Sequence, residues 1–283
     1  MYNRLNLTRP SFPLGSSLVP YMALPFSPKK SLGQHFLTDP NVARKIVGAL
    51  QASPEEPVVE IGPGTGALTG LLQEAYSNLT AIEVDARAVA YLRAHHPGLD
   101  VWQADVLDVD WNVLAEEKGR PLYVISNLPY ALTSPILFSL IDHRTSLCQA
   151  VLMMQHEVAR RLVAGPRTKD YGILSVLTQL YARPALLFRV SRNVFYPKPE
   201  VTSAVIRLAF DKPTAPDPGV DPAFLRTVVR AAFNQRRKTL HNSLGRWTRT
   251  RAIELPHGWD RRRAEELPPD AFVELARYLQ QHS

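Results

Sequence analysis

Short apolar runs alternate with amphipathic stretches over most of the chain before residue 211. An apolar run of strand length predicts a strand buried in a parallel sheet, and an amphipathic stretch between two such runs predicts a helix. Strands are expected at Val58–Ile61, Leu79–Glu83, Asp100–Gln103, Pro121–Ser126, Gln149–Gln155, Leu186–Val190 and Ser203–Phe210. Helices are expected at about 40–50, 66–76, 86–95, 134–142, 156–164 and 172–182. This alternation indicates an α/β fold, with a mostly parallel sheet and helices on both faces.

The pattern changes beyond residue 211. Asp211–Asp221 contains three prolines and a glycine, which is typical of a linker. Helices are expected after it at about 222–234, 237–245 and 269–281. We therefore expect three parts: an irregular basic arm over 1–27, an α/β domain over 28–211, and a small all-helical domain over 212–283.

Composition bounds the class of protein. Hydrophobic residues make up 45% of the chain and charged residues 21%, as in a soluble globular protein. No apolar run reaches transmembrane length, which argues against a membrane-spanning role. The single cysteine, Cys148, excludes an internal disulfide and a cysteine-rich zinc site, and it fits a cytoplasmic location.

The positive charge is concentrated in the last quarter of the chain. Residues 212–283 carry 13 Lys and Arg against 8 Asp and Glu, whereas residues 1–211 carry 20 against 18. From Pro222 to Ile253 there are eight basic residues and no acidic one. A solvated helix face usually mixes both signs, so this one-signed block favours a polyanionic partner such as a nucleic acid.

A glycine-rich turn predicts a nucleotide-type site. Gly62–Gly66 follows the expected strand Val58–Ile61 and precedes an expected helix, which lets the backbone approach a ligand closely. Glu83 stands at the end of the next strand, 21 residues after Gly62. In α/β folds that bind nucleosides, an acid at this place accepts hydrogen bonds from the ribose hydroxyls. The alternative is that Glu83 is a surface acid beside Asp85.

A second candidate site lies at Asn127-Leu128-Pro129-Tyr130, directly after the expected strand Pro121–Ser126. Ligands bind at the carboxyl ends of strands in open α/β sheets. The Asn127 side chain and a nearby backbone carbonyl are acceptors, and Tyr130 has a flat face, so together they could hold a planar base by its exocyclic amine. The alternative is a helix-capping Asn with a core Tyr. Asp105, after another strand, could accept from an adenine amine or merely cap a turn.

Seven motifs of the chain occur together in one order: Leu32–Leu37, Glu60–Gly66, Glu83–Asp85, Asp105, Asn127–Tyr130, Phe195–Pro199 and Phe233–Lys238. The set resembles the KsgA-type ribosomal RNA adenine dimethyltransferases, a family that also takes in eukaryotic relatives and the macrolide-resistance methylases. The resemblance covers about residues 28–283. It implies a Rossmann-like methyltransferase sheet with S-adenosylmethionine as the methyl donor.

The resemblance also implies roles for individual residues. The cofactor would be bound by residues from each motif at the sheet edge: His35 and Leu37, which close over it; Gly62 and Gly64, near its methionine part; Glu83, on its ribose; Asp105, on its adenine amine; and Asn127. The chain departs from the family pattern at His35, where the family usually has Asn.

The chemistry expected at the second site is methylation of an adenine at N6. Acceptors at the Asn127 side chain and at the Leu128 or Pro129 carbonyl would bind the N6 hydrogens and stabilise the positive charge that develops there. Tyr130 would stack on the base, and Phe195 would pack on its other side once the base is flipped out. No metal is required and no metal-ligand cluster is visible.

The basic C-terminal residues would hold the RNA backbone. Arg226 and Arg230 are four residues apart and are followed by Arg236, Arg237 and Lys238. The resemblance therefore implies dimethylation of two adjacent adenines in the 3′-terminal hairpin of 16S-type small-subunit ribosomal RNA, during small-subunit biogenesis. We expect a cytoplasmic monomer that acts on this RNA or on a pre-30S particle.

Three other functions remain open at this point. A large-subunit methylase of the macrolide-resistance type is the first, although Leu32–Gln34 and Phe233–Lys238 favour the small-subunit type. A catalytically dispensable RNA-binding assembly factor is the second, and the intact Gly62–Gly66 and Asn127–Tyr130 argue against it. A nicotinamide oxidoreductase is the third, and it leaves the basic helices unexplained.

Overall fold

The computed structural model describes residues 24–211, 219–250 and 252–282, and it forms two compact units. The first unit runs to His156 and also contains Leu186–Phe210, and the second contains Glu157–Ala185 and Asp211–Ser283. The expected arm over 1–27 lies outside the described residues apart from its last four, as does most of the expected linker.

The two units differ from the expected domains in residues 157–185, which belong to the second unit although they precede the expected boundary at residue 211. The sequence predicts them in the α/β domain, whereas their helix α7 (Ile173–Tyr181) packs against α8 (Pro222–Asn234) and α11 (Pro269–Gln281). The Tyr171 hydroxyl also donates a hydrogen bond of 2.8 Å to the Leu267 carbonyl. These contacts join segments that are far apart in the sequence, so no local sequence pattern predicts them.

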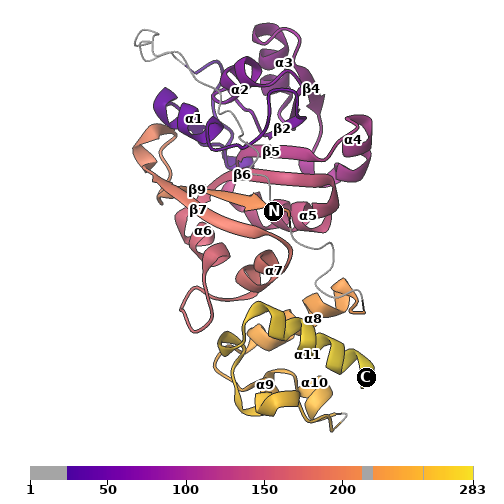
Figure 1. The fold of residues 1–283 in the computed structure, drawn as a ribbon. Helices are drawn as coiled ribbons and strands as arrows, with labels where there is room; N and C mark the ends of the chain where they lie inside the picture. The colour runs from indigo at the N-terminus through magenta and orange to yellow at the C-terminus, as the bar shows by residue number, and fades with distance from the viewer. Residues whose placement is uncertain (1–23, 212–218, 251, 283) are drawn as a thin grey trace, which may run out of the picture. The chain divides into compact units, whose positions relative to one another are not determined.

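The first unit is built on a sheet with the strand order β4–β3–β2–β5–β6–β9–β7 (Figure 1). Neighbouring strands from β4 to β6 are parallel, and β6 and β9 are antiparallel. A second, two-stranded sheet pairs β1 with β8. The bounds are β1 (Phe36–Leu37), β2 (Val58–Ile61), β3 (Leu79–Glu83), β4 (Asp100–Gln103), β5 (Leu122–Asn127), β6 (Leu147–Gln155), β7 (Arg183–Val190), β8 (Phe195–Tyr196) and β9 (Ser203–Ala209).

The predicted α/β fold with a mostly parallel sheet is therefore confirmed. Strand order reverses between β2 and β5, because β3 and β4 extend the sheet to one side of β2 while β5 and β6 extend it to the other. Such a switch point leaves a crevice at the carboxyl ends of the two central strands. Both candidate sites of the sequence, the glycine turn after β2 and Asn127 at the end of β5, lie there.

Side-chain caps explain where several helices of the first unit begin. Asp39 accepts hydrogen bonds from the amides of Asn41 and Val42, and Asp85 accepts one from the amide of Arg87. The expected helix at 66–76 begins only at Thr69, because residues 64–68 are still in turns. One helix, α4, was not predicted. The bounds are α1 (Pro40–Val47), α2 (Thr69–Ala75), α3 (Ala86–His95), α4 (Trp111–Glu117) and α5 (Thr133–Asp142).

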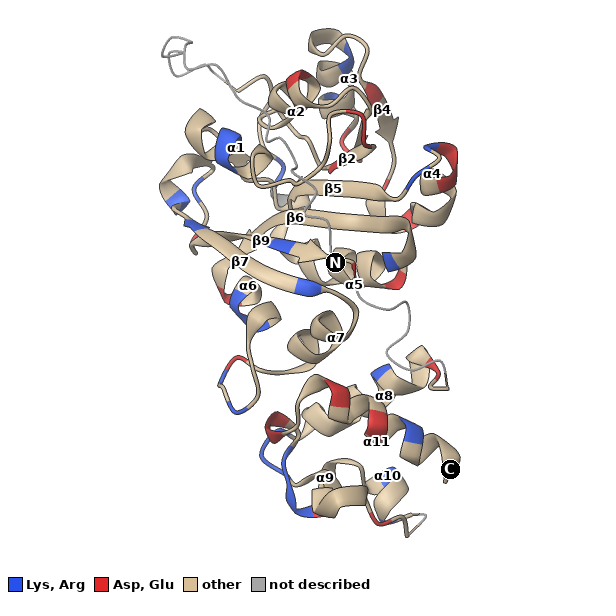
Figure 2. Cartoon of the chain, in the orientation of Figure 1, with Lys and Arg blue, Asp and Glu red and all other residues tan. Residues whose placement is uncertain are grey.

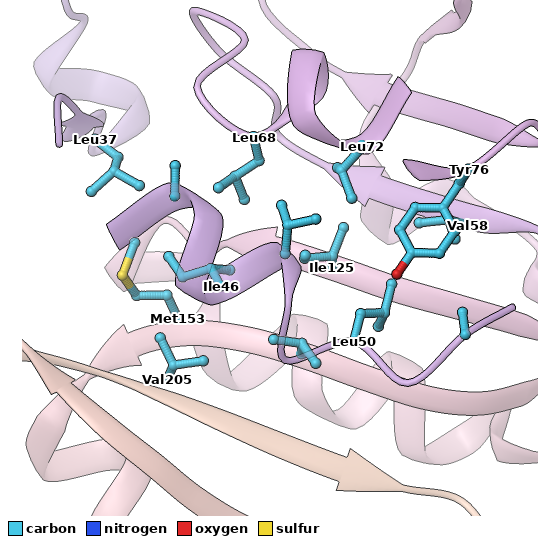
Figure 3. Packing of buried hydrophobic residues seen from close by; sticks show 14 of the residues in the cluster. Leu37, Ile46, Leu50, Val58, Leu68, Leu72, Tyr76, Ile125, Met153 and Val205 are labelled. Carbon is cyan, nitrogen blue, oxygen red and sulfur yellow. The ribbon is translucent and has the colours of Figure 1, made fainter. Parts of the chain in front are cut away.

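A buried apolar cluster joins α1 and α2 to one face of the sheet (Figure 3). Ile46 and Leu72 are fully buried in it, together with Val58 of β2 and Ile125 of β5. Each such side chain stabilises the packed state by roughly 1.5–3 kcal/mol. Leu37 of β1 belongs to the same cluster, so the packing also fixes β1. The core thus positions the loops that surround the crevice.

The second unit is helical in its C-terminal part, as predicted. The Phe233 ring lies 5.9 Å from that of Tyr171 and 5.6 Å from that of Phe272. The helix expected at 237–245 begins at Leu240, because Thr239 is extended and bridges to Arg263. The bounds are α6 (His156–Val163), α7 (Ile173–Tyr181), α8 (Pro222–Asn234), α9 (Leu240–Ser243), α10 (Gly245–Thr248) and α11 (Pro269–Gln281). Across 24–211, 219–250 and 252–282, no helix has the length and apolar character needed to span a membrane.

Candidate active site

A cavity of about 170 Å³ opens at the carboxyl ends of β2, β3 and β5. It brings together residues that the sequence analysis selected from separate motifs. The following predicted site residues line it: His35, Leu37, Gly62, Gly64, Glu83, Asp105, Asn127, Leu128, Pro129 and Tyr130. Their common location agrees with one site that holds both a cofactor and a base.

The glycine turn leaves room on the cavity side. Gly62 has φ +64°, a conformation that side chains rarely adopt, and a Cβ added there would meet no protein atom within 4 Å. Gly64 has φ +56°, and an added Cβ would lie 3.0 Å from the Phe36 ring. The space beside Gly62 is thus left for a ligand, which fits the close approach expected of the cofactor.

Glu83 is buried at the end of β3 and organises the turn. One carboxylate oxygen accepts a hydrogen bond of 3.0 Å from the Gly64 amide, and the other accepts one of 2.8 Å from the Asp85 amide. Burial raises the pKa of Glu83, although the amides of Asp85 and Gly64 oppose this by stabilising the charged form. The reading of Glu83 as a surface acid is therefore wrong, because its side chain is enclosed.

A second buried carboxyl, Glu60 of β2, lines the same cavity and was given no role in the sequence analysis. It accepts a hydrogen bond of 2.7 Å from the Thr69 hydroxyl. Burial raises the pKa of Glu60 to about 8, against the effect of Thr69 and with a further increase from the nearby Glu83. A glutamate inside the apolar run Val58–Ile61 was the signal for such a group.

The stretch Asn127–Tyr130 presents its acceptors in a defined way. The Asn127 side-chain amide donates a hydrogen bond of 3.0 Å to the His35 carbonyl, which leaves its Oδ1 as an acceptor. The Pro129 carbonyl already accepts from the Leu132 amide at 3.0 Å and the Thr133 hydroxyl at 3.2 Å. Within the described parts of the chain, nothing donates to the Leu128 carbonyl. Of the two expected backbone acceptors, Leu128 is thus the available one.

His35 and Tyr130 form a stacked pair, with ring centroids 5.4 Å apart and an interplanar angle of 28°. The Tyr130 hydroxyl is 2.7 Å from the Ser203 hydroxyl, and the His35 Nδ1 is 2.7 Å from the Pro197 carbonyl. Burial raises the pKa of Tyr130. The imidazole therefore contacts one face of the ring on which a target base was expected to stack.

Phe195 is not where the sequence analysis expected it. Its side chain is only 5% exposed and belongs to the apolar cluster that joins α1 and α2 to the sheet, and it does not line the cavity. The reason is the pairing of β8 with β1, in which Phe195 lies opposite the buried Leu37. The next residue, Tyr196, is exposed.

Asp105 is placed to serve in both roles that the sequence left open, as a cap of a turn and as an acceptor for a ligand. Its Oδ1 caps the short helix Val106–Asp108 by accepting a hydrogen bond of 2.9 Å from the Leu107 amide. The residue also lines the cavity and is exposed. The cap holds the carboxylate in place, and the other oxygen can accept from a ligand.

The residues expected to bind RNA lie in the second unit and differ in their surroundings. Arg230, Arg237 and Lys238 are exposed. Arg236 instead donates to the Glu265 carboxylate at 2.7 Å and to the carbonyls of Lys169 and Thr168 at 2.6 and 2.9 Å. Each of its three side-chain nitrogens thus makes a hydrogen bond, so Arg236 joins two loops of the unit, although its side chain is still 40% exposed. Arg226 is half-buried on α8.

A basic cluster forms beside α9, where Figure 2 shows blue segments close together. The bridge between Thr239 and Arg263, and a hydrogen bond of 2.7 Å from the Leu240 amide to the Arg262 carbonyl, align the two segments. They bring the exposed Arg261–Arg263 next to Arg237 and Lys238. The sequence analysis gave Arg261–Arg263 no role, although the run of three arginines was visible.

The fold and the cavity define a Rossmann-like, S-adenosylmethionine-dependent methyltransferase. The family model described as ribosomal RNA adenine dimethylase matches residues 26–281. The chain therefore belongs to the ribosomal RNA adenine dimethylase family.

Two relatives agree with this assignment. The chain is 56% identical over 275 residues to the ribosomal RNA small subunit methyltransferase A of Salinibacter ruber, with 96% of this chain and 92% of the relative covered. It is 50% identical over 226 residues to the protein of the same name from Chlorobium chlorochromatii, covering 80% and 84%.

Two crystal structures are similar in fold. A dimethyladenosine transferase from Plasmodium falciparum has a TM-score of 0.71 at 23% identity, covering 88% of this chain and 98% of that one. The 23S rRNA methyltransferase ErmE has a TM-score of 0.62 at 26% identity, covering 87% and 100%.

Proposed function

We propose that this methyltransferase dimethylates N6 of two adjacent adenines in the 3′-terminal hairpin of 16S-type small-subunit ribosomal RNA. The observation that carries the proposal is the meeting of Asn127–Tyr130 with the glycine turn and Glu83 in one cavity. The choice of the small subunit is supported by relatives of 56% and 50% identity, which are named for that subunit. The large-subunit enzyme ErmE is less similar, at 26% identity.

The cofactor side of the cavity would be held by residues from several strands. Glu83 would accept hydrogen bonds from the ribose hydroxyls, and Asp105 would accept from the adenine amine. Gly62 and Gly64 would let the backbone approach the methionine part, while His35 and Leu37 would close the site. Asn127 would contribute to the cofactor side as well. S-adenosylmethionine, when bound, supplies a methyl group attached to a positively charged sulfur.

The base side is the Asn127–Tyr130 stretch. The N6 of adenine is a poor nucleophile because its lone pair is delocalised into the ring. Acceptance of the N6 hydrogens by Asn127 Oδ1 and the Leu128 carbonyl would favour a localised lone pair and stabilise the charge that develops on N6. Tyr130 would stack on the base. Since His35 stacks on one face of Tyr130, the base would have to use the other face or displace the imidazole.

Alignment would supply much of the rate, because two reacting atoms are held in fixed orientation. The proton of N6 can leave to water after methyl transfer, so the mechanism assigns no general base. A second methylation requires that one N6–H contact be dispensable, since the monomethylated amine has only one hydrogen left. Two acceptors of different kinds, a side-chain amide and a backbone carbonyl, are compatible with this.

RNA would be bound through the exposed cations of the second unit. Arg230, Arg237 and Lys238, joined by Arg261–Arg263, can contact phosphates, with Arg226 as a further candidate on the same helix as Arg230. Arg236 would contribute less to this role, because its guanidinium also holds two loops of the unit together. We further propose that the chain acts as a cytoplasmic monomer on a pre-30S particle.

The proposal is tested by transfer of labelled methyl groups to two substrates. Small ribosomal particles that lack the modification and large-subunit RNA are offered separately at the same concentration. Label in the small particles alone is expected. Label in the large-subunit RNA alone would assign the chain to the resistance type, and label in neither would contradict the proposed activity.

A further inference from the structure

The segment from Phe26 to Gln34 reaches the cofactor cavity with its last three residues. Leu32, Gly33 and Gln34 line the cavity together with Glu83. At the start of the segment, the Phe26 ring makes edge contacts with Phe36 and Tyr91, with centroids 5.6 and 6.1 Å apart. The segment has no strand or long helix of its own between these residues, so side-chain contacts must hold it in place.

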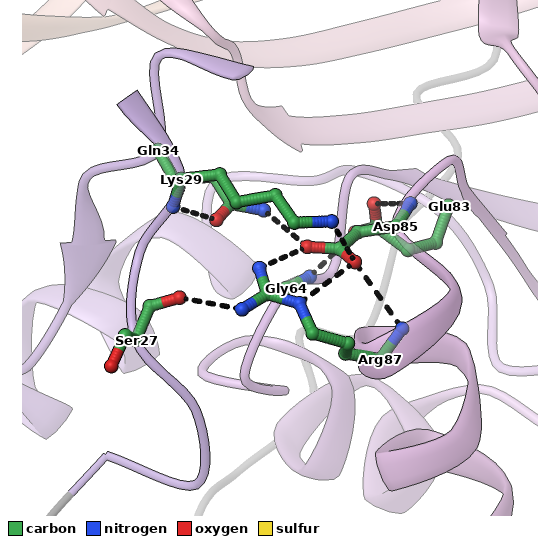
Figure 4. A network of polar contacts seen from close by, with 7 residues as sticks. All are labelled: Ser27, Lys29, Gln34, Gly64, Glu83, Asp85 and Arg87. Atoms are coloured by element: carbon green, nitrogen blue, oxygen red, sulfur yellow. Dashed lines mark hydrogen bonds and ion pairs between the residues drawn. The ribbon is translucent and has the colours of Figure 1, made fainter. Parts of the chain in front are cut away.

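Those contacts converge on Asp85, as Figure 4 shows. Its carboxylate accepts hydrogen bonds from Lys29 Nζ at 3.1 Å and from the Gln34 side-chain amide at 3.2 Å, both of which belong to the segment. On the other side it accepts from Arg87 Nε at 3.1 Å and from a terminal guanidinium nitrogen at 2.6 Å. Arg87 in turn donates to the Ser27 carbonyl at 3.0 Å.

The charge balance makes this network sensitive to the position of the segment. The Asp85 side chain is fully buried, and the Arg87 guanidinium beside it holds the pKa of its carboxyl well below the usual range. A buried charge is costly unless it is paired and hydrogen-bonded. If the segment moved away, the carboxylate would lose Lys29 and Gln34. Asp85 caps α3 by accepting a hydrogen bond from the Arg87 amide alone. Its hydrogen bonds with the side chains of Lys29, Gln34 and Arg87 are not needed for capping.

We propose that Asp85 is a positioning residue that locks the segment Phe26–Gln34 over the bound cofactor. The inference rests on cofactor binding in this cavity, as proposed above. The backbone amide of Asp85 also holds Glu83, so one residue links the ribose-binding acid to the covering segment. If the cofactor binds tightly only when the segment is closed, its apparent affinity decreases as the fraction of molecules with a closed segment decreases.

The test is the variant Asp85→Asn. Asn remains a good helix cap, so α3 keeps its start while the segment loses its ionic partner. We expect the dissociation constant and the KM for S-adenosylmethionine to rise by about tenfold, as for the loss of hydrogen bonds to one charged group. The value of kcat at saturating cofactor should stay within about twofold, since the closed, loaded state is unchanged.

A second readout follows the segment itself. Cleavage by trypsin after Lys29 requires the backbone of the segment to leave its packed position, so bound cofactor should slow this cleavage in the wild type. At one subsaturating cofactor concentration, this protection should be weaker in Asp85→Asn than in the wild type. Lys29→Met removes a half-exposed partner and should raise the KM by only about threefold.

Lys118→Met is the matched control, because it removes an ion pair of 3.2 Å with Asp100 that does not line the cavity. It should leave the KM and the protection unchanged. Cofactor binding to the wild type is measured first and tests the cavity separately, and its absence would remove the basis of the inference. Wild-type affinity and protection in Asp85→Asn would overturn the inference, as would a loss of kcat at unchanged KM.

Discussion

Replacement of Glu60 by Gln should change how the stability of the first unit depends on pH. The buried carboxyl has its pKa raised from 4.5 to about 8, so it is protonated in the folded protein at neutral pH, while in the unfolded chain it is ionised. The folded state therefore holds this proton more tightly. The resulting stability is fully present below the unfolded pKa and is lost as the pH rises toward the folded value near 8.

The size of the effect follows from the shift. Between the two pKa values, each pH unit costs about 1.4 kcal/mol of unfolding free energy, so from about pH 5 to about pH 7 the wild type should lose about 3 kcal/mol through this group. Glu60→Gln cannot titrate, yet its amide oxygen can still accept from the Thr69 hydroxyl. The variant should therefore lack this loss, whatever its absolute stability.

The assay is urea denaturation followed by tryptophan fluorescence at several pH values. The difference between wild type and variant removes the contributions of the other titrating groups, because these are common to both. Glu116→Gln, which changes an exposed glutamate of α4, is the control and should follow the wild type. If Glu60→Gln shows the same pH dependence as the wild type, Glu60 is not held protonated and the electrostatic account of the cavity fails.

Three further predictions concern the cofactor and the second unit. S-adenosylmethionine carries positive charge and would enter a cavity with two carboxyls of raised pKa, so its binding at about pH 7 should lower these pKa values and release up to about one proton. Titration calorimetry in two buffers of different ionisation enthalpy measures the number of protons released. Equal binding heats in the two buffers would refute the prediction. Arg236→Ala should lower the unfolding free energy by roughly 1 kcal/mol, because it removes three hydrogen bonds, although the Thr168 carbonyl keeps the Tyr171 amide as a donor. Arg237→Ala should instead weaken RNA binding and reduce its salt dependence, without loss of stability. If Arg236→Ala weakened RNA binding and Arg237→Ala lowered stability, the roles given to the two arginines would be wrong.

The parts of the fold set by local pattern could be predicted from the sequence. Strands Val58–Ile61 and Leu79–Glu83 have the predicted bounds, because each is a compact apolar run closed by turn residues. Helix α4, Trp111–Glu117, was missed because it is short and half polar, and its stability depends on the burial of Trp111, whose Nε1 donates to Ser139 at 3.2 Å. A contact of this kind has no local signature.

The cavity residues could be selected from motifs, but their electrostatics could not. The place of Glu60 in an apolar strand suggests burial, but its protonation depends first on how completely the fold encloses it, with Thr69 opposing and Glu83 of the next strand adding to the effect. Arg236 looked like one more cation in a basic run, and only the fold brings Glu265 and the loop at residues 168–169 to it. Phe195 was assigned to the base-binding site from its motif, but the pairing of β8 with β1 places its side chain in the apolar core.

The most direct measurement is nucleoside mass spectrometry of small-subunit RNA after incubation of unmodified particles with S-adenosylmethionine and the enzyme. The wild type should produce N6,N6-dimethyladenosine, and so should the control Asn41→Ala, which changes an exposed residue of α1. Asn127→Ala, which removes the proposed side-chain acceptor for N6, should slow its formation by at least about a hundredfold. Dimethyladenosine at an unchanged rate in Asn127→Ala, or none with the wild type, would contradict the central claim that this cavity dimethylates adenine.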